Sequence, residues 1–178
     1  TAEQGKSESR SLIESWHGKG RNRYVITPRF AISCSTEQLI AAGRLHEQYP
    51  GTYIQTHLSE NKDEIDSTLS LCPDCQDYLE VYERARLVTD RSIFGHCIHL
   101  SDSECRRLVE AGSVVAHCPT SNLFLGSGLF DMQQANRVGM QTVLATDIGA
   151  GTSFSMLRTM GEAYKVQQLG GYPMSVFE

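Results

Sequence analysis

The chain has 178 residues, of which 40% are hydrophobic and 21% are charged, and its formal net charge is −5. This composition excludes a disordered chain and is typical of one globular unit with enough apolar residues for a core. Its charges form no long single-sign block, so we expect no nucleic-acid partner. Since no apolar run could span a bilayer and the first ten residues lack the apolar core of a secretory signal, we expect a cytoplasmic protein with no membrane partner.

The six cysteines are too widely spaced for a disulfide framework, and a reduced compartment suits them. Cys72 and Cys75 have the C-x-x-C spacing of redox and zinc sites. No second pair follows at zinc-ribbon distance, so we interpret them as an incidental pair in a loop.

Short β-branched or apolar runs alternate with amphipathic helical stretches, a pattern typical of a parallel sheet wrapped by helices. After a helix-like opening at 9–16, strands are predicted at 23–30, 52–57, 92–97, 113–118 and 141–147. Helices are predicted between and after them at 35–49, 61–89 with a break at Pro73, 101–110, 130–138 and 153–168. Ser35 with Gln38, and Ser101 with Glu104, have the spacing of capping boxes.

Five β/α units are too few to close an eight-stranded barrel. We therefore expect an α/β fold that is a partial TIM barrel, (β/α)₈, corresponding to about strands 4 to 8 and forming one partial catalytic domain over residues 1–178. A doubly wound open sheet is the competing architecture. The first β/α turn carries no Gly-rich phosphate loop that would support it.

Each predicted strand ends in a residue that can ionise, coordinate a metal or form strong hydrogen bonds: Arg29, His57, His96, His117 and Asp147. In a (β/α)₈ barrel the active site is assembled at these strand ends, so the five side chains are expected to face one cavity. Imidazole nitrogens with a carboxylate form a ligand set that suits Zn²⁺ or Fe²⁺. His99, three residues past His96, is expected to face away and not to be a ligand.

Two further features suit a catalytic pocket. Glu60 comes three residues after His57, where a carboxylate could shuttle protons above a metal, although it could equally be an exposed residue at the start of a helix. Arg29 and Phe30 pair a fork of donors with an aromatic face, which suits a planar heterocycle with a carbonyl edge. The segments 119–122, 126–128 and 149–151 are predicted to be turns at the mouth of the cavity.

The motifs VITPRF, THLSEN, GHCIHL, AHCPTSN and ATDIGAGTSFSML, in this order and spacing, resemble the guanine deaminase family of the amidohydrolase superfamily over essentially the whole chain. The resemblance implies a homodimeric enzyme with one zinc ion per subunit that hydrolyses guanine to xanthine and ammonia. It implies metal ligation by His57 and Asp147, on the fifth and eighth barrel strands. His96, on the sixth strand, would orient the attacking hydroxide or contact the substrate, and some relatives use it as a ligand.

The resemblance also implies the substrate contacts. Arg29 and Phe30 would hold the purine, and Glu60 would transfer protons to a ring nitrogen and to the leaving amine. Asp147 would accept the proton of the attacking water, and His117 and Asn122 would line the pocket. The residues expected to face the substrate are therefore Arg29, Phe30, His57, Glu60, His96 and Asp147.

The sequence departs from the family pattern in lacking the first barrel strands, which carry an H-x-H pair of ligands. We therefore expect the natural chain to extend in both directions, and the 178 residues alone to be inactive and prone to aggregate.

Two alternatives remain open. One is another aminohydrolase of the superfamily, acting on an adenine, pterin or triazine ring, against which Arg29 and Phe30 argue. The other is a non-catalytic relative that keeps the barrel as a scaffold, which the retained polar residues at the strand ends disfavour.

Overall fold

Five parallel strands form one sheet in the computed structural model, which describes residues 1–171. The strands are β1 (Val25–Ile26), β2 (Tyr53–Leu58), β3 (Ser92–His96), β4 (Val114–His117) and β5 (Gln141–Leu144). Each strand pairs with the next along the chain, in the order β1-β2-β3-β4-β5. Because a doubly wound sheet reverses its strand order at a switch point, this sequential order confirms the partial barrel and shows that the open-sheet alternative is wrong.

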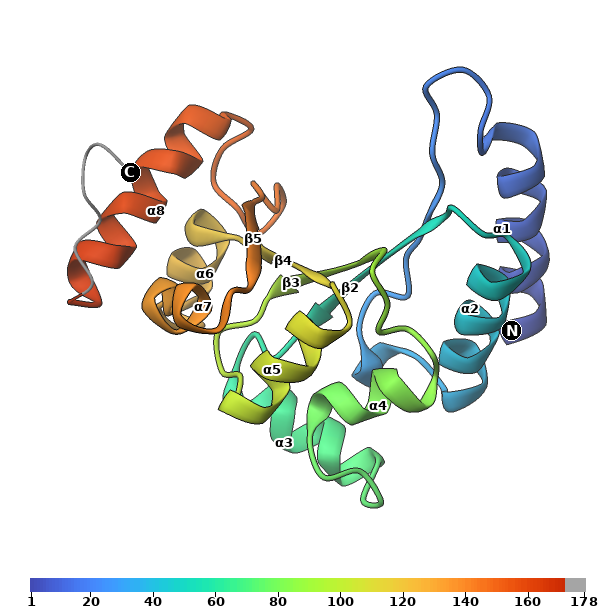
Figure 1. Ribbon diagram of the computed structural model, residues 1–178, viewed down its shortest axis with the longest axis horizontal. Helices are drawn as coiled ribbons and strands as arrows, with labels where there is room; N and C mark the ends of the chain where they lie inside the picture. Colours follow the sequence, from blue (N-terminus) through green and yellow to red (C-terminus); the bar gives the residue numbers. More distant parts are fainter. Residues whose placement is uncertain (172–178) are drawn as a thin grey trace.

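The helices follow one another along one side of the sheet, with the first helix, α1, and the last, α8, at opposite ends of the molecule (Figure 1). They are α1 (Ala2–Trp16), α2 (Thr36–Gln48), α3 (Lys62–Leu71), α4 (Tyr78–Arg84), α5 (Asp102–Glu110), α6 (Pro119–Leu125), α7 (Met132–Val138), α8 (Met156–Leu169) and the 3₁₀ helix η1 (Ala31–Ser33). Among the described residues, every helix is too short or too polar to span a bilayer.

Local sequence signals explain where several helices begin. Ser35 with Gln38, and Ser101 with Glu104, form the two predicted capping boxes at the starts of α2 and α5. A third box, formed by Asn61 and Glu64, starts α3. Helix α3 therefore begins after Glu60 and leaves this residue in the connection from β2.

The core lies between the sheet and the helices. Ile54, Leu58 and Phe94 alternate along β2 and β3 and are fully buried in one cluster with helical side chains such as Tyr82. Since successive side chains of a strand point to opposite faces, the immediate neighbours of these residues along each strand lie on the other face of the sheet. His57 is one of these and is only half-buried.

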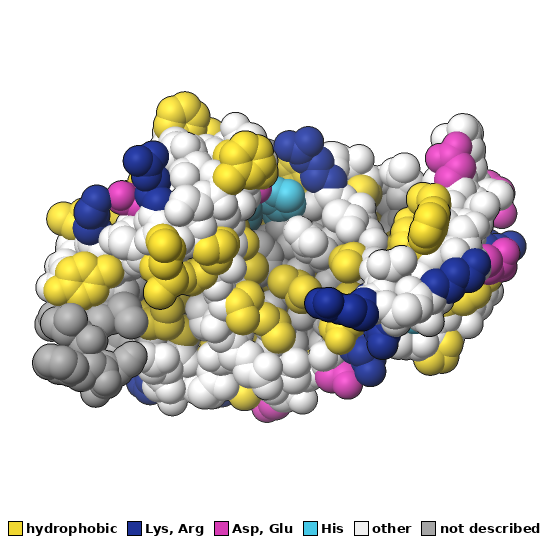
Figure 2. Space-filling model, turned by 90° about the horizontal axis from the view of Figure 1, so that it is seen from above, with side chains coloured by type: hydrophobic (Ala, Val, Ile, Leu, Met, Phe, Trp, Pro, Cys, Tyr) yellow, Lys and Arg dark blue, Asp and Glu magenta, His cyan; other side chains and the backbone are white. Residues whose placement is uncertain are grey.

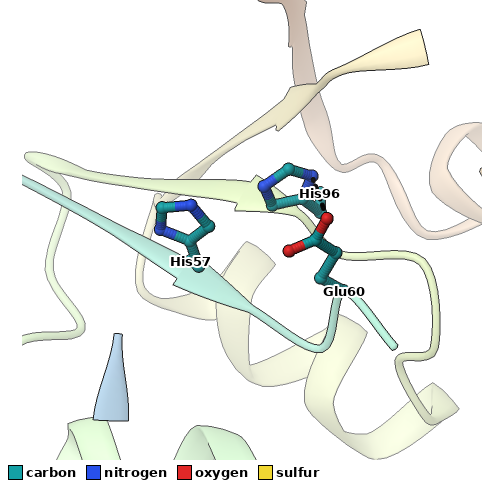
Figure 3. A group of neighbouring side chains, drawn as sticks. All are labelled: His57, Glu60 and His96. Atoms are coloured by element: carbon teal, nitrogen blue, oxygen red, sulfur yellow. Dashed lines mark ion pairs between the residues drawn. The ribbon is translucent and has the colours of Figure 1, made fainter. Parts of the chain in front are cut away.

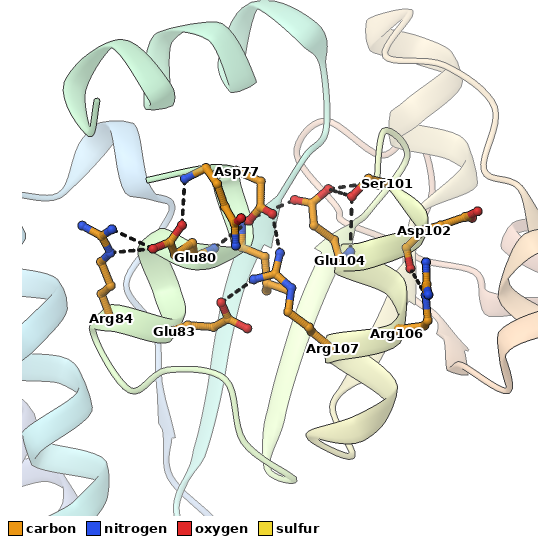
Figure 4. Close-up of polar contacts among 11 residues, drawn as sticks. Asp77, Glu80, Glu83, Arg84, Ser101, Asp102, Glu104, Arg106 and Arg107 are labelled. Carbon is orange, nitrogen blue, oxygen red and sulfur yellow. Dashed lines mark hydrogen bonds and ion pairs between the residues drawn. The ribbon is translucent and has the colours of Figure 1, made fainter. Parts of the chain in front are cut away.

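Helices α4 and α5 are joined on their outer side by charged contacts (Figure 4). Arg107 of α5 forms ion pairs with Asp77, the N-cap of α4, and with Glu83. Glu104 Oε1 also accepts a hydrogen bond of 3.4 Å from the backbone N–H of Leu79. These contacts connect two consecutive β/α units.

Four predicted elements differ from the structure. The helix-like opening expected at 9–16 is longer, because α1 begins at Ala2. The strand expected at 23–30 is only two residues long, because Pro28 has no N–H for the ladder and Arg29 and Phe30 follow in a loop. The strand expected at 141–147 ends at Leu144, and Asp147 lies in the connection beyond it. The turn predicted at 119–122 is wrong, because Pro119 starts helix α6, where its missing N–H costs no hydrogen bond.

Candidate functional site

His57, Glu60 and His96 converge at the carboxyl ends of β2 and β3 (Figure 3). Each offers one ligand atom, and these atoms all lie within 4.8 Å of one another. The two imidazole rings are stacked, with centroids 5.0 Å apart, and His96 Nδ1 lies 3.8 Å from Glu60 Oε1. In the space-filling view a histidine side chain is visible in a hollow, with hydrophobic and basic side chains nearby (Figure 2). Two imidazoles and a carboxylate within this distance could hold a divalent cation.

His57 is oriented by the segment that follows β1. Its Nδ1 lies 2.7 Å from the carbonyl oxygen of Arg29. Because a carbonyl oxygen can only accept, Nδ1 carries the proton and Nε2 keeps its lone pair. Histidine ligands in metal sites are held by this kind of bond from the second ring nitrogen.

The backbone at the end of β3 turns His96 toward His57. In the ladder His96 is opposite Leu58, a core residue, so strand alternation alone would direct its side chain toward the helices. His96 and Cys97 instead adopt left-handed conformations, with φ of 69° and 52°. Non-glycine residues in this region are strained and cluster at functional sites. The left-handed backbone at His96 and Cys97 therefore accounts for the direction of the His96 imidazole, which points into the site instead of toward the helices.

Asp147 reaches the group from the other edge of the His96 ring. Its Oδ2 lies 3.9 Å from His96 Nε2, and its backbone is also left-handed, with φ of 45°. The predicted ligand pair was His57 with Asp147, whereas the close cluster among the described residues contains Glu60 and His96 with His57. His96 therefore lies between two carboxylates. Imidazole nitrogens and carboxylate oxygens suit zinc, so these residues fit such an ion.

Glu60 is a partly buried carboxylate in the site. Its side chain is only 13% exposed, and its Oε1 accepts a hydrogen bond of 3.2 Å from the hydroxyl of Ser127. Its backbone N–H donates to the carboxylate of Glu64 at 2.9 Å. The residue lines a cavity of about 580 Å³ together with His99 and Ser127. This environment differs from that of a solvated residue in the first turn of a helix.

Phe30 packs beside the metal-site candidates. Its ring centroid is 5.5 Å from that of His57, and the guanidinium carbon of Arg29 lies 5.5 Å from the Phe30 centroid. An aromatic face and a guanidinium fork therefore lie next to the imidazole cluster, as the sequence predicted for a planar substrate.

Comparison with known proteins places the chain in a family. The model of the amidohydrolase family matches residues 1–177. This chain belongs to the amidohydrolase family. Guanine deaminase from Escherichia coli (strain K12) is 52% identical over 178 residues, which cover 100% of this chain and 40% of that protein. The chain thus spans about 40% of the length of this curated relative.

Solved amidohydrolase structures share the fold. E. coli guanine deaminase superposes with a TM-score of 0.97 at 52% identity, over 100% of this chain and 41% of that one. Guanine deaminase from C. acetobutylicum, with guanine bound in its active site, gives a TM-score of 0.91 at 31% identity, over 97% and 42% of the two chains. A zinc-bound adenosine deaminase from Xanthomonas campestris gives 0.86 at 22% identity, over 94% and 38%, which shows the common fold alone.

His117 is placed differently from the other strand-end residues of this amidohydrolase. It is fully buried, and its ring stacks on the core residue Phe130 with centroids 4.7 Å apart. Both ring nitrogens lack a hydrogen-bond partner among the described residues. Burial, with a smaller contribution from His96, lowers the pKa of His117 to about 4. His99 also lies outside the cluster, with Nε2 bonded to the carbonyl oxygen of Ser127 at 2.9 Å.

Tyr82 is a buried residue behind the site that the sequence did not single out. Its hydroxyl accepts hydrogen bonds from Ala31 N–H and the Thr56 hydroxyl, both at 3.0 Å, and donates to the carbonyl oxygen of His57 at 2.8 Å. In sequence Tyr82 is one apolar position of an amphipathic helix. Only the packing of α4 under the sheet reveals that it connects two site segments.

Proposed function

We propose that the protein carrying this chain is a cytoplasmic guanine deaminase, which hydrolyses guanine to xanthine and ammonia. The observation that carries the proposal is the convergence of His57, Glu60 and His96, with Asp147 at the far edge of the His96 ring. The identity of 52% to the E. coli enzyme over the whole chain, and the guanine bound in the C. acetobutylicum relative, support guanine as the substrate.

The proposal includes one zinc ion per subunit, held by His57 and Asp147. The Nδ1 bond of His57 to Arg29 leaves Nε2 available as a ligand atom, and the adenosine deaminase of the same fold binds zinc. When bound, zinc supplies the Lewis acidity that makes a water molecule nucleophilic at neutral pH.

The remaining roles belong to the side chains. Asp147 accepts a proton from the attacking water as its oxygen bonds to C2 of guanine. Protonated Glu60 donates its proton to the adjacent ring nitrogen, where it stays in the product. As the C2=O bond forms, Glu60 takes the proton of the C2 hydroxyl and passes it to the amine, which leaves as ammonia when the C2–N bond breaks. The proton held by Asp147 then returns to Glu60. The Glu60 side chain is only 13% exposed and lies beside His96, which supports this role.

Substrate binding is assigned to the segment after β1. Arg29 donates hydrogen bonds to the carbonyl edge of the purine, and Phe30 packs against its ring face. These contacts distinguish guanine from adenine, because adenine carries no ring carbonyl. His96 orients the water between the two carboxylates.

The test uses the full-length protein that carries this chain. Ammonia release is measured with guanine, adenine, a pterin and a triazine, together with the zinc content by elemental analysis and the molar mass in solution by light scattering. Guanine should be the preferred substrate of a zinc-containing homodimer. A higher kcat/KM with another heterocycle would overturn the substrate, and a zinc-free protein that releases no ammonia would favour a non-catalytic scaffold.

A further inference from the structure

Helix α6 contacts the site through the side-chain amide of Asn122. Asn122 Oδ1 lies 2.8 Å from His96 Nδ1, and the two side chains are only 1% and 2% exposed. The residues are 26 positions apart and come from different β/α units. A buried hydrogen bond of this length restrains the rotation of the imidazole ring.

Asn122 is itself held firmly by the backbone. Its N–H donates to the carbonyl oxygen of Cys118 at 2.9 Å, and its carbonyl oxygen accepts from Ser127 N–H at 2.9 Å. The bond to Cys118 belongs to the first turn of α6, and the bond from Ser127 joins Asn122 to the segment that follows this helix. The amide therefore has a fixed position from which it can orient His96.

We propose that Asn122 is a positioning residue that keeps the proton of His96 on Nδ1 and leaves Nε2 as the acceptor that faces Asp147. The amide oxygen can only accept, so the bond to it requires a proton on Nδ1.

The other ring nitrogen is then free for the reaction. The distance of 3.9 Å from His96 Nε2 to Asp147 Oδ2 is too long for a direct hydrogen bond. An acceptor nitrogen beside this carboxylate can receive a hydrogen bond from the attacking water and hold its oxygen lone pair toward the substrate. This catalytic consequence rests on the proposed deaminase function, whereas the tautomer of His96 does not.

The opposite orientation of the Asn122 amide gives a clear alternative. Its Nδ2 has no partner among the described residues, and a turned amide would donate from Nδ2 to His96 Nδ1 and move the ring proton to Nε2. The two arrangements therefore differ in which His96 nitrogen is protonated, and this difference is measurable.

The tautomer is measured by ¹⁵N NMR of full-length protein labelled at histidine, with the His96 signals assigned by their loss in His96→Gln. We expect a protonated Nδ1 and an unprotonated Nε2 in the metal-free wild-type protein. Asn122→Asp, which keeps an acceptor at the same place, should retain this pattern. Asn122→Leu should give a mixture of tautomers, and Asn136→Leu, on the exposed face of α7, should change nothing. A wild-type His96 protonated on Nε2, or an unchanged pattern in Asn122→Leu, would overturn the proposal.

Kinetic measurements on the same variants test whether the orientation of His96 by Asn122 matters for the reaction. We expect Asn122→Leu to lower kcat by about 10- to 100-fold, the range for loss of a residue that orients a site histidine. The KM for guanine and the zinc content should stay near wild-type values, and Asn122→Asp should recover most of the rate. Equal kcat values in Asn122→Leu and wild type would contradict the role. If wild type does not deaminate guanine, the proposed function fails, while the NMR result still decides the tautomer.

Discussion

The hydroxyl of Tyr82 donates a hydrogen bond of 2.8 Å to the carbonyl oxygen of His57 and accepts one of 3.0 Å from the backbone N–H of Ala31. One phenol therefore connects the end of β2 to the segment that carries Arg29 and Phe30. Because Tyr82 is fully buried, water cannot replace these bonds when they are removed. The relative position of His57 and the proposed purine contacts thus depends on a core residue of α4.

Tyr82→Phe removes this hydroxyl with little change in shape. We expect the free energy of unfolding to fall by about 1–3 kcal/mol, because the backbone N–H of Ala31 and the carbonyl oxygen of His57 lose buried partners. Urea denaturation of the full-length protein measures the change. Tyr164→Phe is the matched control, since Tyr164 is 44% exposed on α8. Equal losses in the two variants would contradict the role given to Tyr82.

His57→Gln tests the proposed metal ligand. Removing one imidazole from the site should reduce the zinc content of the purified protein well below ~1 equivalent per subunit. The measurement is elemental analysis after dialysis against a weak chelator. His99→Gln is the control: its Nε2 bonds to Ser127 and it lies outside the cluster, so this variant should keep its zinc. The assignment is wrong if both variants keep zinc, or if His99→Gln alone loses it.

Glu60→Gln keeps the size of the side chain and removes its basicity. We expect kcat for guanine to fall by about 10²- to 10⁴-fold, the usual contribution of a general acid–base group. Binding of guanine, followed by calorimetry, should persist. Glu110→Gln, at the exposed end of α5, should keep the wild-type kcat. A fall of less than about threefold in Glu60→Gln would remove this carboxylate from the chemical step.

The buried imidazole of His117 makes stability depend on pH. Its pKa is about 4 in the folded protein and 6.5 in the reference state. Between these values the unfolded chain takes up a proton and the folded chain does not, so the free energy of unfolding falls as the pH drops from about 6.5 to about 4. A difference of this size corresponds to about 3 kcal/mol. Urea unfolding at several pH values measures this change. The free energy of unfolding should fall less between pH 6.5 and 4 in His117→Leu than in the wild type, and the same pH dependence in both proteins would contradict the role given to His117.

Arg107→Gln breaks the contacts between α4 and α5. The Arg107 side chain is 21% exposed and pairs with both Asp77 and Glu83, so we expect a loss of about 1–2 kcal/mol in unfolding free energy. Arg86→Gln removes an ion pair to Glu47 whose Arg86 side chain is 72% exposed, and it should change the unfolding free energy less than Arg107→Gln does. A larger effect at Arg86 than at Arg107 in thermal unfolding would refute the comparison.

Local and periodic signals in the sequence predict most of the elements. The capping boxes at Ser35 and Ser101 start α2 and α5 where predicted, because capping depends on residues only three positions apart. The strand that was expected at 23–30 is shorter, since its length depends on which N–H groups find partners in the neighbouring strand. Strand ends are therefore less predictable than helix starts.

The sequence by itself determined the parallel β/α architecture and the candidate residues His57, Glu60, His96 and Asp147, since these follow from periodicity, composition and motifs. Only the tertiary structure decided how they lie. Alternation along β3 directs His96 toward the core, and a left-handed backbone with the bond to Asn122 turns it into the site. His117, also at a strand end, packs on Phe130 instead. The direction of a side chain at a strand end depends on backbone conformation and on partners distant in sequence, which no local pattern encodes.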